Sequence, residues 1–218
     1  MFISNFVSVT GTIGAGKTSL VTNLAKHFGF ESMFEPVKEN PYLELFYKDM
    51  DKYAFAMQVW LLNCRYRQHK EIVVRIANGS LKGVVQDRNL FEDQIFCTML
   101  YEQKKISQVD YHTYLDLLDN IVAHDVVYPG LIVYLRCSPE TAMSRIAQRG
   151  RACEKGISME YMKDLHSHYE GYISGMQSAG ARILEIDYEK FLPVEYIAGL
   201  ISKNNPPPTL YAKMVRPL

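Results

Sequence analysis

The sequence predicts an α/β protein in which a parallel five-stranded sheet carries helices on both faces. Two observations lead to this fold class. Short apolar segments rich in β-branched residues alternate with longer segments of helical periodicity along most of the 218 residues. A glycine-rich loop joins the first of these strands to the first helix. Apolar strands that alternate with helices form parallel sheets covered on both faces, and ligands bind beyond the carboxyl ends of the strands.

Each predicted strand is a short apolar run, and each predicted helix has apolar residues three or four positions apart. The strands are residues 6–9, 30–34, 83–86, 131–135 and 182–186. The helices are residues 19–27, a short helix that opens at Asn40 and carries Tyr47, and residues 53–77, 91–104, 108–123, 138–149, 159–176 and 194–201. A turn at Pro129 and Gly130 precedes the fourth strand. We expect one domain over residues 1–202 and a tail over 203–218, whose prolines prevent a helix at its start.

The composition limits the classes of partner and the compartment. Lysine and arginine together number 24, as do aspartate and glutamate, so the formal net charge is zero. Such a chain has no basic field to hold a polyanion, which argues against nucleic acid. The four cysteines form no C-x-x-C pair and are typical of reduced thiols. The sequence shows no signal peptide and no apolar run long enough to span a membrane. We therefore expect a soluble, cytoplasmic protein without a membrane partner.

The first loop fits the phosphate-binding pattern G-x-x-x-x-G-K-[ST] at every position. It reads Gly11-Thr12-Ile13-Gly14-Ala15-Gly16-Lys17-Thr18, with Ser19 next in the helix. A strand, a glycine loop and a helix N-terminus aim backbone N–H groups at one point, which predicts a P-loop NTPase-type fold that binds ATP. Lys17 would meet the outer phosphates and the Thr18 hydroxyl would bind Mg²⁺. The alternative is a strand-to-helix turn that binds nothing.

Two further strands deliver charged residues to the same edge of the sheet. Glu35 follows the second strand and precedes Pro36, which pushes its backbone to extended geometry. Asp87 and Arg88 end the third strand, where a carboxylate can hold Mg²⁺ and an arginine can bind a phosphate oxygen or orient Glu35. The alternatives are a surface pair of Glu35 with Lys38 and a buried structural pair of Asp87 with Arg88.

Arg145 and Arg149 are four positions apart on one predicted helix, and Arg151 lies just beyond. Like charges at this spacing cost roughly 0.2–0.5 kcal/mol in an isolated helix, so a phosphoryl group is a reason to keep them. The alternative is a solvated helix whose arginines pair with Glu140 or Glu154.

In combination, these segments resemble the deoxynucleoside kinase family over roughly residues 5 to 190. The matching pieces are the phosphate loop, Glu35-Pro36-Val37, Gln58, Asp87-Arg88-Asn89 with Asp93, the arginines from Arg145 to Arg151 with Glu154, Leu165-His166 and Tyr169-Glu170. The resemblance implies an ATP- and Mg²⁺-dependent kinase that phosphorylates the 5′-hydroxyl of a deoxyribonucleoside. Asn89 departs from the hydroxyl residue that the family usually has there.

The resemblance also implies roles for single residues. Glu35 is the base that activates the 5′-hydroxyl, assisted by Lys17, Arg88 and Arg145. A lid over about residues 145–157 closes Arg145, Arg149 and Arg151 over ATP, and Glu189-Lys190-Phe191 lies near the adenine. Tyr47 and Glu154 hold the sugar 3′-hydroxyl, unless they are a core tyrosine and a lid surface charge. Two long helices, residues 53–77 and 108–123, are candidates for a homodimer interface.

The base pocket is expected from Gln58, Arg65 and Asp93. Gln58 and Arg65 are seven positions apart and share a helix face. A glutamine amide suits adenine or cytosine, and a carboxylate held by Arg65 favours an exocyclic amino group over the carbonyl oxygen of thymine. Asn40 stands where some pyrimidine-preferring relatives place a bulky aromatic residue. We therefore predict deoxyadenosine first, deoxycytidine or deoxyguanosine second and thymidine poor, unless Gln58 and Asp93 are packing or capping groups.

Two other functions share this fold. A nucleoside monophosphate kinase of the thymidylate type also has a lid, but its phosphate acceptor needs no general base, so Glu35 followed by Tyr47 argues against it. A non-catalytic nucleotide-binding subunit should have lost Lys17, Glu35 or the lid arginines, all of which are present.

Overall fold

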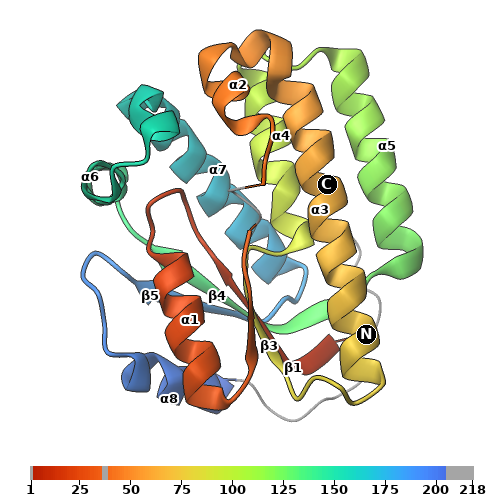
Figure 1. The fold of residues 1–218 in the computed structure, drawn as a ribbon, viewed down its shortest axis with the longest axis vertical. Helices are drawn as coiled ribbons and strands as arrows, with labels where there is room; N and C mark the ends of the chain where they lie inside the picture. Colours follow the sequence, from red (N-terminus) through yellow and green to blue (C-terminus); the bar gives the residue numbers. More distant parts are fainter. Residues whose placement is uncertain (1, 36–38, 205–218) are drawn as a thin grey trace.

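The computed structural model describes residues 2–35 and 39–204, and its centre is a parallel sheet of five strands in the order β2-β3-β1-β4-β5 (Figure 1). The strands are β1 (Phe2–Thr10), β2 (Glu31–Met33), β3 (Val84–Asp87), β4 (Tyr128–Arg136) and β5 (Ile183–Asp187). All four strand pairs are parallel. The fold class predicted from the sequence is confirmed. The last helix runs to Asn204, so the first two residues of the predicted tail, Lys203 and Asn204, belong to this helix.

The expected turn at Pro129 and Gly130 is wrong, because both residues lie inside β4. Pro129 pairs with Ile3 of β1, and the register between the two strands shifts between Ile3 and Val7. A proline has no N–H to donate to the ladder, so it is tolerated in a sheet at such an irregularity.

The helices lie within a few residues of their predicted limits. They are α1 (Lys17–Phe28), α2 (Leu43–Lys48), α3 (Met50–Ala77), α4 (Asp93–Glu102), α5 (Gln108–Asp125), α6 (Pro139–Arg149), α7 (Met159–Ser178) and α8 (Val194–Asn204). Two short 3₁₀ helices, η1 (Leu90–Glu92) and η2 (Ala152–Gly156), were not predicted. The predicted helix 91–104 is therefore divided at Asp93. Asn89 caps the start of η1, because its side-chain oxygen accepts hydrogen bonds from the N–H groups of Phe91 and Glu92.

Two layers of helices enclose the sheet (Figure 1). On one side, α1 packs on the first three strands and against α8. On the other side, Ile72 of α3 packs on Phe6 and Val84 of the sheet, while α4 lies between α3 and α7. Helix α5 packs outside α3 and α4. The phosphate loop, the end of β2 and the end of β3 emerge together at the carboxyl edge of the sheet, so this edge holds the predicted site.

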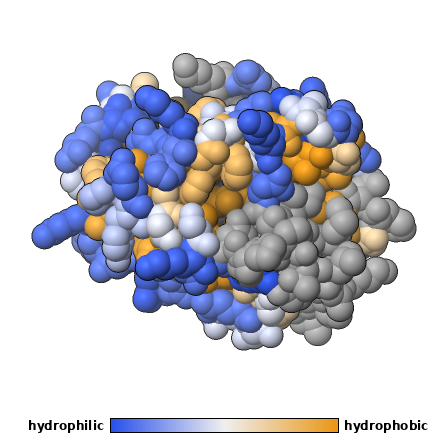
Figure 2. Space-filling view, turned by 90° about the horizontal axis from the view of Figure 1, so that it is seen from below, coloured by the Kyte–Doolittle hydropathy of each residue, from blue (hydrophilic) through white to orange (hydrophobic). Residues whose placement is uncertain are grey.

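The opposite end of the molecule, seen in Figure 2, carries mostly hydrophilic side chains interrupted by smaller apolar areas. Among the helices of the described part of the chain, none has both the length and the hydropathy of a membrane span.

Candidate active site

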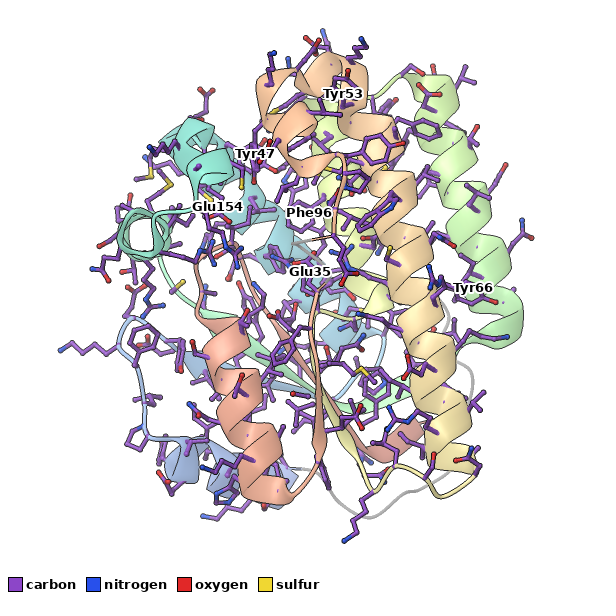
Figure 3. All side chains as sticks on the ribbon, viewed as in Figure 1. Glu35, Tyr47, Tyr53, Tyr66, Phe96 and Glu154 are labelled. Carbon is purple, nitrogen blue, oxygen red and sulfur yellow. The ribbon has the colours of Figure 1, made fainter. Side chains whose placement is uncertain are left out.

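A cavity of about 540 Å³ lies at the carboxyl edge of the sheet. Its walls come from the phosphate loop, the segment after β2, α2, α3, the end of β3, α4 and the segment from α6 to α7. Figure 3 shows Glu35 and Phe96 near the centre of this region, with Tyr47 and Glu154 above them between α7 and α3. The sequence therefore brings together residues from most of its length at one cavity.

The phosphate loop has the backbone that its glycines predict. Gly14 has a φ of 80°, and a Cβ there would meet the carbonyl oxygen of Ala142 at 2.5 Å. Gly11 approaches the carbonyl oxygen of Leu135 in the same way, at 2.8 Å. Only glycine fits these positions without displacement of backbone atoms. Ile13 and Gly14 line the cavity, Ala15 and Gly16 complete the loop, and Ser19 is exposed in the first turn of α1.

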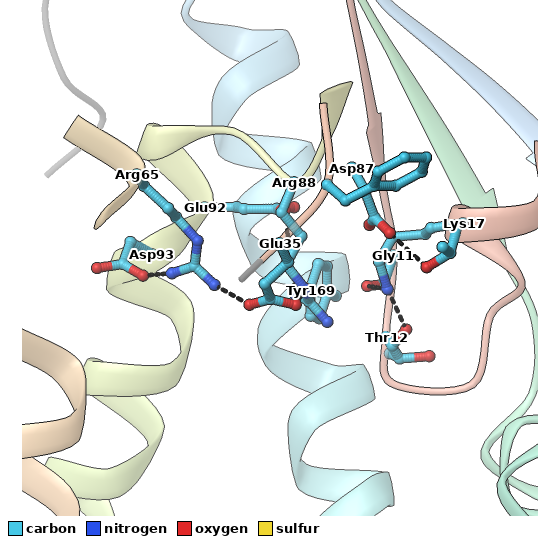
Figure 4. Close-up of polar contacts among 12 residues, drawn as sticks. Gly11, Thr12, Lys17, Glu35, Arg65, Asp87, Arg88, Glu92, Asp93 and Tyr169 are labelled. Carbon is cyan, nitrogen blue, oxygen red and sulfur yellow. Dashed lines mark hydrogen bonds and ion pairs between the residues drawn. The ribbon is translucent and has the colours of Figure 1, made fainter. Parts of the chain in front are cut away.

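Lys17 is folded back onto this loop (Figure 4). Its Nζ donates to the carbonyl oxygens of Gly11 at 3.0 Å and Thr12 at 2.8 Å. Burial and the neighbouring Arg88 lower the pKa of Lys17 to about 8, although the carboxylates of Asp87, Glu92 and Glu35 oppose this shift. Lys17 is thus a buried cation at the wall of the cavity, held by carbonyl groups that a phosphate can replace.

Thr18 and Asp87 meet as the predicted magnesium pair. The Thr18 hydroxyl donates to Asp87 Oδ2 at 2.5 Å, and Asp87 Oδ1 is buried without a hydrogen-bond partner in the described structure. A buried carboxylate oxygen without a partner, beside a hydroxyl group, is a donor set that suits Mg²⁺ with its waters and phosphate oxygens. These two residues fit the ion that the phosphate loop implies.

Glu35 lies two residues beyond β2, with its side chain about 20% exposed to the cavity. One carboxylate oxygen accepts from Arg65 Nη2 and the other accepts from Arg88 Nε at 3.1 Å. Burial alone would raise the pKa of Glu35, but Arg88, Arg65 and Lys17 together lower it to about 2. Glu35 is therefore a fixed carboxylate in the ionised form. The alternative partner, Lys38, and the neighbouring Pro36 lie outside the described residues.

Arg88 follows β3 with a φ of 64°, a left-handed backbone that a non-glycine residue adopts rarely and mostly at functional sites. Its guanidinium carbon lies 4.8 Å from the ring centre of Phe96 and 5.8 Å from that of Tyr169. Because Arg88 lines the cavity and binds Glu35, it connects the end of β3 with the end of β2.

The base-pocket residues do not all reach the cavity. Gln58 and Arg65 line it from α3, and Gln58 Oε1 is buried without a hydrogen-bond partner among the described residues. Asp93 is fully buried and is not among the described residues of the cavity wall. Its carboxylate pairs with Arg65 and accepts from the Tyr114 hydroxyl at 2.7 Å. Asp93 thus stands behind Arg65, instead of facing a base as the sequence reasoning expected.

The lid residues form a closed ion-pair cluster. Glu154 Oε2 accepts from Arg149 Nη2 at 2.7 Å, and Glu154 Oε1 accepts from Arg151 Nη1 at 3.2 Å. All three line the cavity, as does Tyr47 from α2. Burial raises the pKa of Tyr47 well above its usual value, with Tyr161 and Glu154 adding to the shift. The pairing with Glu154 is the alternative considered for these arginines, and it still leaves them at the cavity wall.

Arg145 lies elsewhere. It is not among the described cavity residues, and it donates to the carbonyl oxygens of Ala15 at 3.1 Å and Tyr188 at 2.7 Å. Its guanidinium carbon lies 4.3 Å from the ring centre of Phe191. Arg145 thus lies behind the phosphate loop, outside the described wall of the cavity that holds Glu35.

The three residues Glu189, Lys190 and Phe191 have different surroundings. Phe191 is 64% exposed beside Gly16, and Lys190 is also exposed. Glu189 accepts from the backbone N–H and the hydroxyl of Ser138, and from the hydroxyl of Thr141. Glu189 therefore caps the N-terminus of α6, a structural contact that the sequence analysis did not assign.

Among the residues at this site that received no role from the sequence are Phe96, Tyr161, Glu92 and Tyr169. Phe96 and Tyr161 line the cavity, while Tyr169 and Glu92 are fully buried next to Arg88. Burial raises the pKa of Glu92 to about 7, although Arg88 and Lys17 pull it down. The sequence signal that could have identified Glu92 is its position beside Asp93, where two acidic residues follow one another in a mostly apolar segment.

Comparison with known proteins gives a consistent result. The sequence model of the family described as "Deoxynucleoside kinase" matches residues 7–198. A "Deoxyadenosine/deoxycytidine kinase" of Bacillus subtilis (strain 168) is 38% identical over 189 residues, which are 85% of this chain and 85% of that protein. A "Deoxyadenosine kinase" of Dictyostelium discoideum is 37% identical over 195 residues, 89% of this chain and 77% of that protein. The solved structure of deoxyadenosine kinase from M. mycoides with bound dATP has a TM-score of 0.79 and 34% identity, covering 90% of this chain and 98% of that one.

Proposed function

Because this chain belongs to the deoxynucleoside kinase family, we propose that it transfers the γ-phosphoryl group of ATP to the 5′-hydroxyl of a deoxyribonucleoside, with deoxyadenosine preferred. The observation that carries this proposal is the Glu35 carboxylate, which is fixed by Arg65 and Arg88 and shares one cavity with Lys17 of the phosphate loop. An acceptor hydroxyl between these groups would have a proton acceptor on one side and the phosphate donor on the other.

Seven residues of the cavity have a proposed part in this reaction. Lys17 exchanges its loop carbonyls for the outer phosphates, and Arg88 offers a guanidinium nitrogen to the transferred group. Thr18 and Asp87 would hold Mg²⁺, which neutralises phosphate charge. Tyr47 and Glu154 would bind the 3′-hydroxyl. Glu35 accepts the proton of the 5′-hydroxyl as the new O–P bond forms and the bond between the γ-phosphorus and ADP breaks.

The preference for deoxyadenosine rests on Gln58. Its unpartnered carbonyl oxygen and its amide N–H₂ stand side by side on the wall of the cavity, and adenine presents a matching donor and acceptor on one edge. Thymine also presents a donor and an acceptor, its N3–H and a carbonyl oxygen, and Gln58 meets them only with its amide turned over, whereas an amide oxygen directed at an exocyclic amino group suits adenine. The names of two of the similar proteins, which include deoxyadenosine, support the same choice.

An assay with labelled ATP, Mg²⁺ and each of the four deoxynucleosides tests the proposal, with Lys17→Ala as the inactive control. We expect a monophosphate product, with deoxyadenosine giving the highest kcat/KM. Thymidine as the best substrate would refute the preference for deoxyadenosine, and no product from any deoxynucleoside would refute the function. Thymidine monophosphate as an added acceptor distinguishes the thymidylate type of kinase, whose acceptor is a phosphate.

We further propose a homodimer formed through α3 and α5. Val74 of α3 is 57% exposed, and Val109 and Leu117 of α5 are 76% and 42% exposed. Large apolar side chains on two helices that pack together are a surface that a second copy could cover. Light scattering after gel filtration should give twice the mass of the chain, and Leu117→Glu should reduce it to one chain. A wild-type monomer at micromolar concentration would refute the dimer.

The cytoplasm is the compartment that we propose. All four cysteines are free in the structure, and Cys97 and Cys137 are buried. A protein with unpaired thiols suits a reducing compartment. Cell fractionation followed by detection of the chain tests this location, and recovery outside the cytoplasmic fraction would overturn it.

A further inference from the structure

Two nitrogens and one face of the Arg88 guanidinium group are occupied. Nε donates to Glu35 at 3.1 Å, Nη1 donates to the Tyr169 hydroxyl, and the Phe96 ring covers one face of the group. Nη2 has no hydrogen-bond partner among the described residues. A planar guanidinium group binds a phosphate oxygen and a carboxylate together only when its plane is fixed, because its N–H directions lie in that plane. The contacts behind Arg88 therefore determine where its free nitrogen points.

Tyr169 provides the first of these contacts from α7. Its side chain is fully buried, and it is absent from the described residues of the cavity wall. The hydroxyl accepts the hydrogen bond from Nη1, and the ring centre lies behind it, 5.8 Å from the guanidinium carbon of Arg88. Figure 4 shows Tyr169 directed at Arg88 and Glu35 from the helix behind them. Tyr169 thus contacts Arg88 without reaching the space where a substrate would lie.

Glu92 provides the second contact. Its Oε1 lies 3.9 Å from Arg88 Nη1, the nitrogen that also binds Tyr169. The residue is fully buried, and neither carboxyl oxygen has a hydrogen-bond partner in the part of the chain that the structure describes. A buried carboxyl group without partners is costly, so its retention beside a buried guanidinium group points to a role toward that group. It stands one residue before Asp93, which forms a direct ion pair with Arg65.

We infer that Tyr169 and Glu92 are positioning residues for phosphoryl transfer, holding Arg88 Nη1 so that Nε stays on Glu35 and Nη2 faces the transferred group. The inference rests on the proposed function and deepens it. Neither residue touches substrate in this arrangement; both act through Arg88. Loss of either contact should turn the guanidinium plane and disturb the general base and the phosphate contact together. A displacement of about 1 Å at a reacting group can cost about 10²-fold in rate.

The first test is Tyr169→Phe, with Tyr134→Phe as the matched control. The two tyrosines are stacked with ring centres 6.3 Å apart, and both are almost fully buried. The Tyr134 hydroxyl donates to Glu170 at 2.7 Å instead of binding Arg88. We expect Tyr169→Phe to lower kcat about 10- to 100-fold with KM for both substrates changed less than about threefold, whereas Tyr134→Phe keeps kcat within about twofold. An unchanged kcat in Tyr169→Phe, or an equal loss in both variants, would overturn the inference.

A second test does not depend on the proposed activity. The side-chain ¹⁵N NMR signal of Arg88, assigned by its absence in Arg88→Lys, reports whether rotation of the guanidinium group is restricted. We expect separate Nη signals in the wild type and in Tyr134→Phe, and averaged signals in Tyr169→Phe. Glu92→Gln, which keeps the shape of the side chain, should show intermediate averaging. Restricted rotation in both Tyr169→Phe and Glu92→Gln would refute the positioning role, while a rigid Arg88 in an inactive wild type would count against the proposed function alone.

Discussion

The substitution Glu35→Gln removes one negative charge and keeps the shape of the side chain. Its carboxylate stands between Arg65 and Arg88, whose side chains are 2% and 3% exposed. Breaking a fully buried ion pair costs about 3–5 kcal/mol, because the remaining charge is left uncompensated. Glu35 itself is about 20% exposed, Asp93 still pairs with Arg65, and Glu92 stays near Arg88. These three facts reduce the expected loss to about 2 kcal/mol of unfolding free energy.

The effect on catalysis should be larger and separate from the effect on stability. A glutamine amide cannot accept the proton of the 5′-hydroxyl, so kcat should fall about 10²- to 10⁴-fold with KM changed far less. Because the pKa of Glu35 is about 2, below the usual 4.5, the wild-type residue is ionised at every working pH. Its stabilising contribution is present above pH 4.5 and is lost as the pH falls toward 2. The kcat profile of the wild type should accordingly show no ionisation of Glu35 between about pH 5 and 8.

The assay is steady-state kinetics with ATP and deoxyadenosine, paired with urea unfolding. Glu31→Gln is the matched control, since Glu31 opens the same strand and binds Arg75 at the surface with 2.6 Å between Oε2 and Nη2. A surface pair contributes about 0–1 kcal/mol, so this variant should keep both kcat and stability. If Glu35→Gln retains kcat and only KM rises, Glu35 is a binding residue and the general-base mechanism is wrong. If its stability equals that of the wild type, the two buried arginines do not depend on it.

Three further predictions concern single residues around this network. Lys17→Ala should abolish ATP turnover and leave the circular dichroism spectrum unchanged. In the wild type, kcat/KM for ATP should fall as the pH rises through about 8, where free Lys17 loses its charge. A kcat/KM that stays constant up to about pH 9 would contradict this. His69 is buried and accepts a hydrogen bond from the Val127 N–H, and burial lowers its pKa from 6.5 to about 4. Unfolding free energy should thus be constant above pH 6.5 and fall by on the order of 3 kcal/mol down to pH 4, with a smaller fall in His69→Gln, as measured by urea titrations. Asp87→Asn should raise the Mg²⁺ concentration for half-maximal rate about tenfold or more in a magnesium titration, and an unchanged value would remove Asp87 from the metal site.

The sequence was sufficient for the parts of the site that depend on backbone. Local patterns determine the five strands, the phosphate loop and the positions of Glu35 and Asp87 at strand ends. Parallel strands end at one edge of a sheet, so residues at those ends meet whatever the loops between them do. Gly14 shows why the loop can be predicted from the sequence. Its backbone has a positive φ and a carbonyl oxygen lies close to it, so hardly any residue other than glycine fits there.

The pairing of charged side chains was less predictable. The sequence analysis gave the pairing of Arg149 and Arg151 with Glu154 only as an alternative, because the three side chains meet where η2 turns the chain back toward the end of α6, and this short 3₁₀ helix has no strong sequence signature. Arg145 has three acceptors among backbone carbonyls, which every residue possesses, so its sequence neighbours could not indicate them. Asn89 was noted only as a departure from a family pattern. In the structure, the side-chain oxygen of Asn89 caps η1, as a serine or threonine hydroxyl could. Its amide nitrogen also donates to the Ser8 hydroxyl at 2.9 Å.

Arg65 and Asp93 illustrate why the order of residues between the cavity and the core could not be predicted from the sequence. The sequence reasoning assigned both to one pocket, and both do belong to one network, in which Arg65 contacts Glu35 on one side and Asp93 on the other. Side-chain length decides which of them reaches the cavity. Asp93 is the first residue of α4, and its short side chain is already engaged by the Tyr114 hydroxyl of α5, whereas the long stem of Arg65 extends from α3 to the cavity wall. A substitution of Asp93 therefore acts on a base or on Glu35 only through Arg65. Membership of a site can be inferred from residue types and spacing, but the order of residues between the ligand and the core depends on interhelical packing, which a single sequence does not specify.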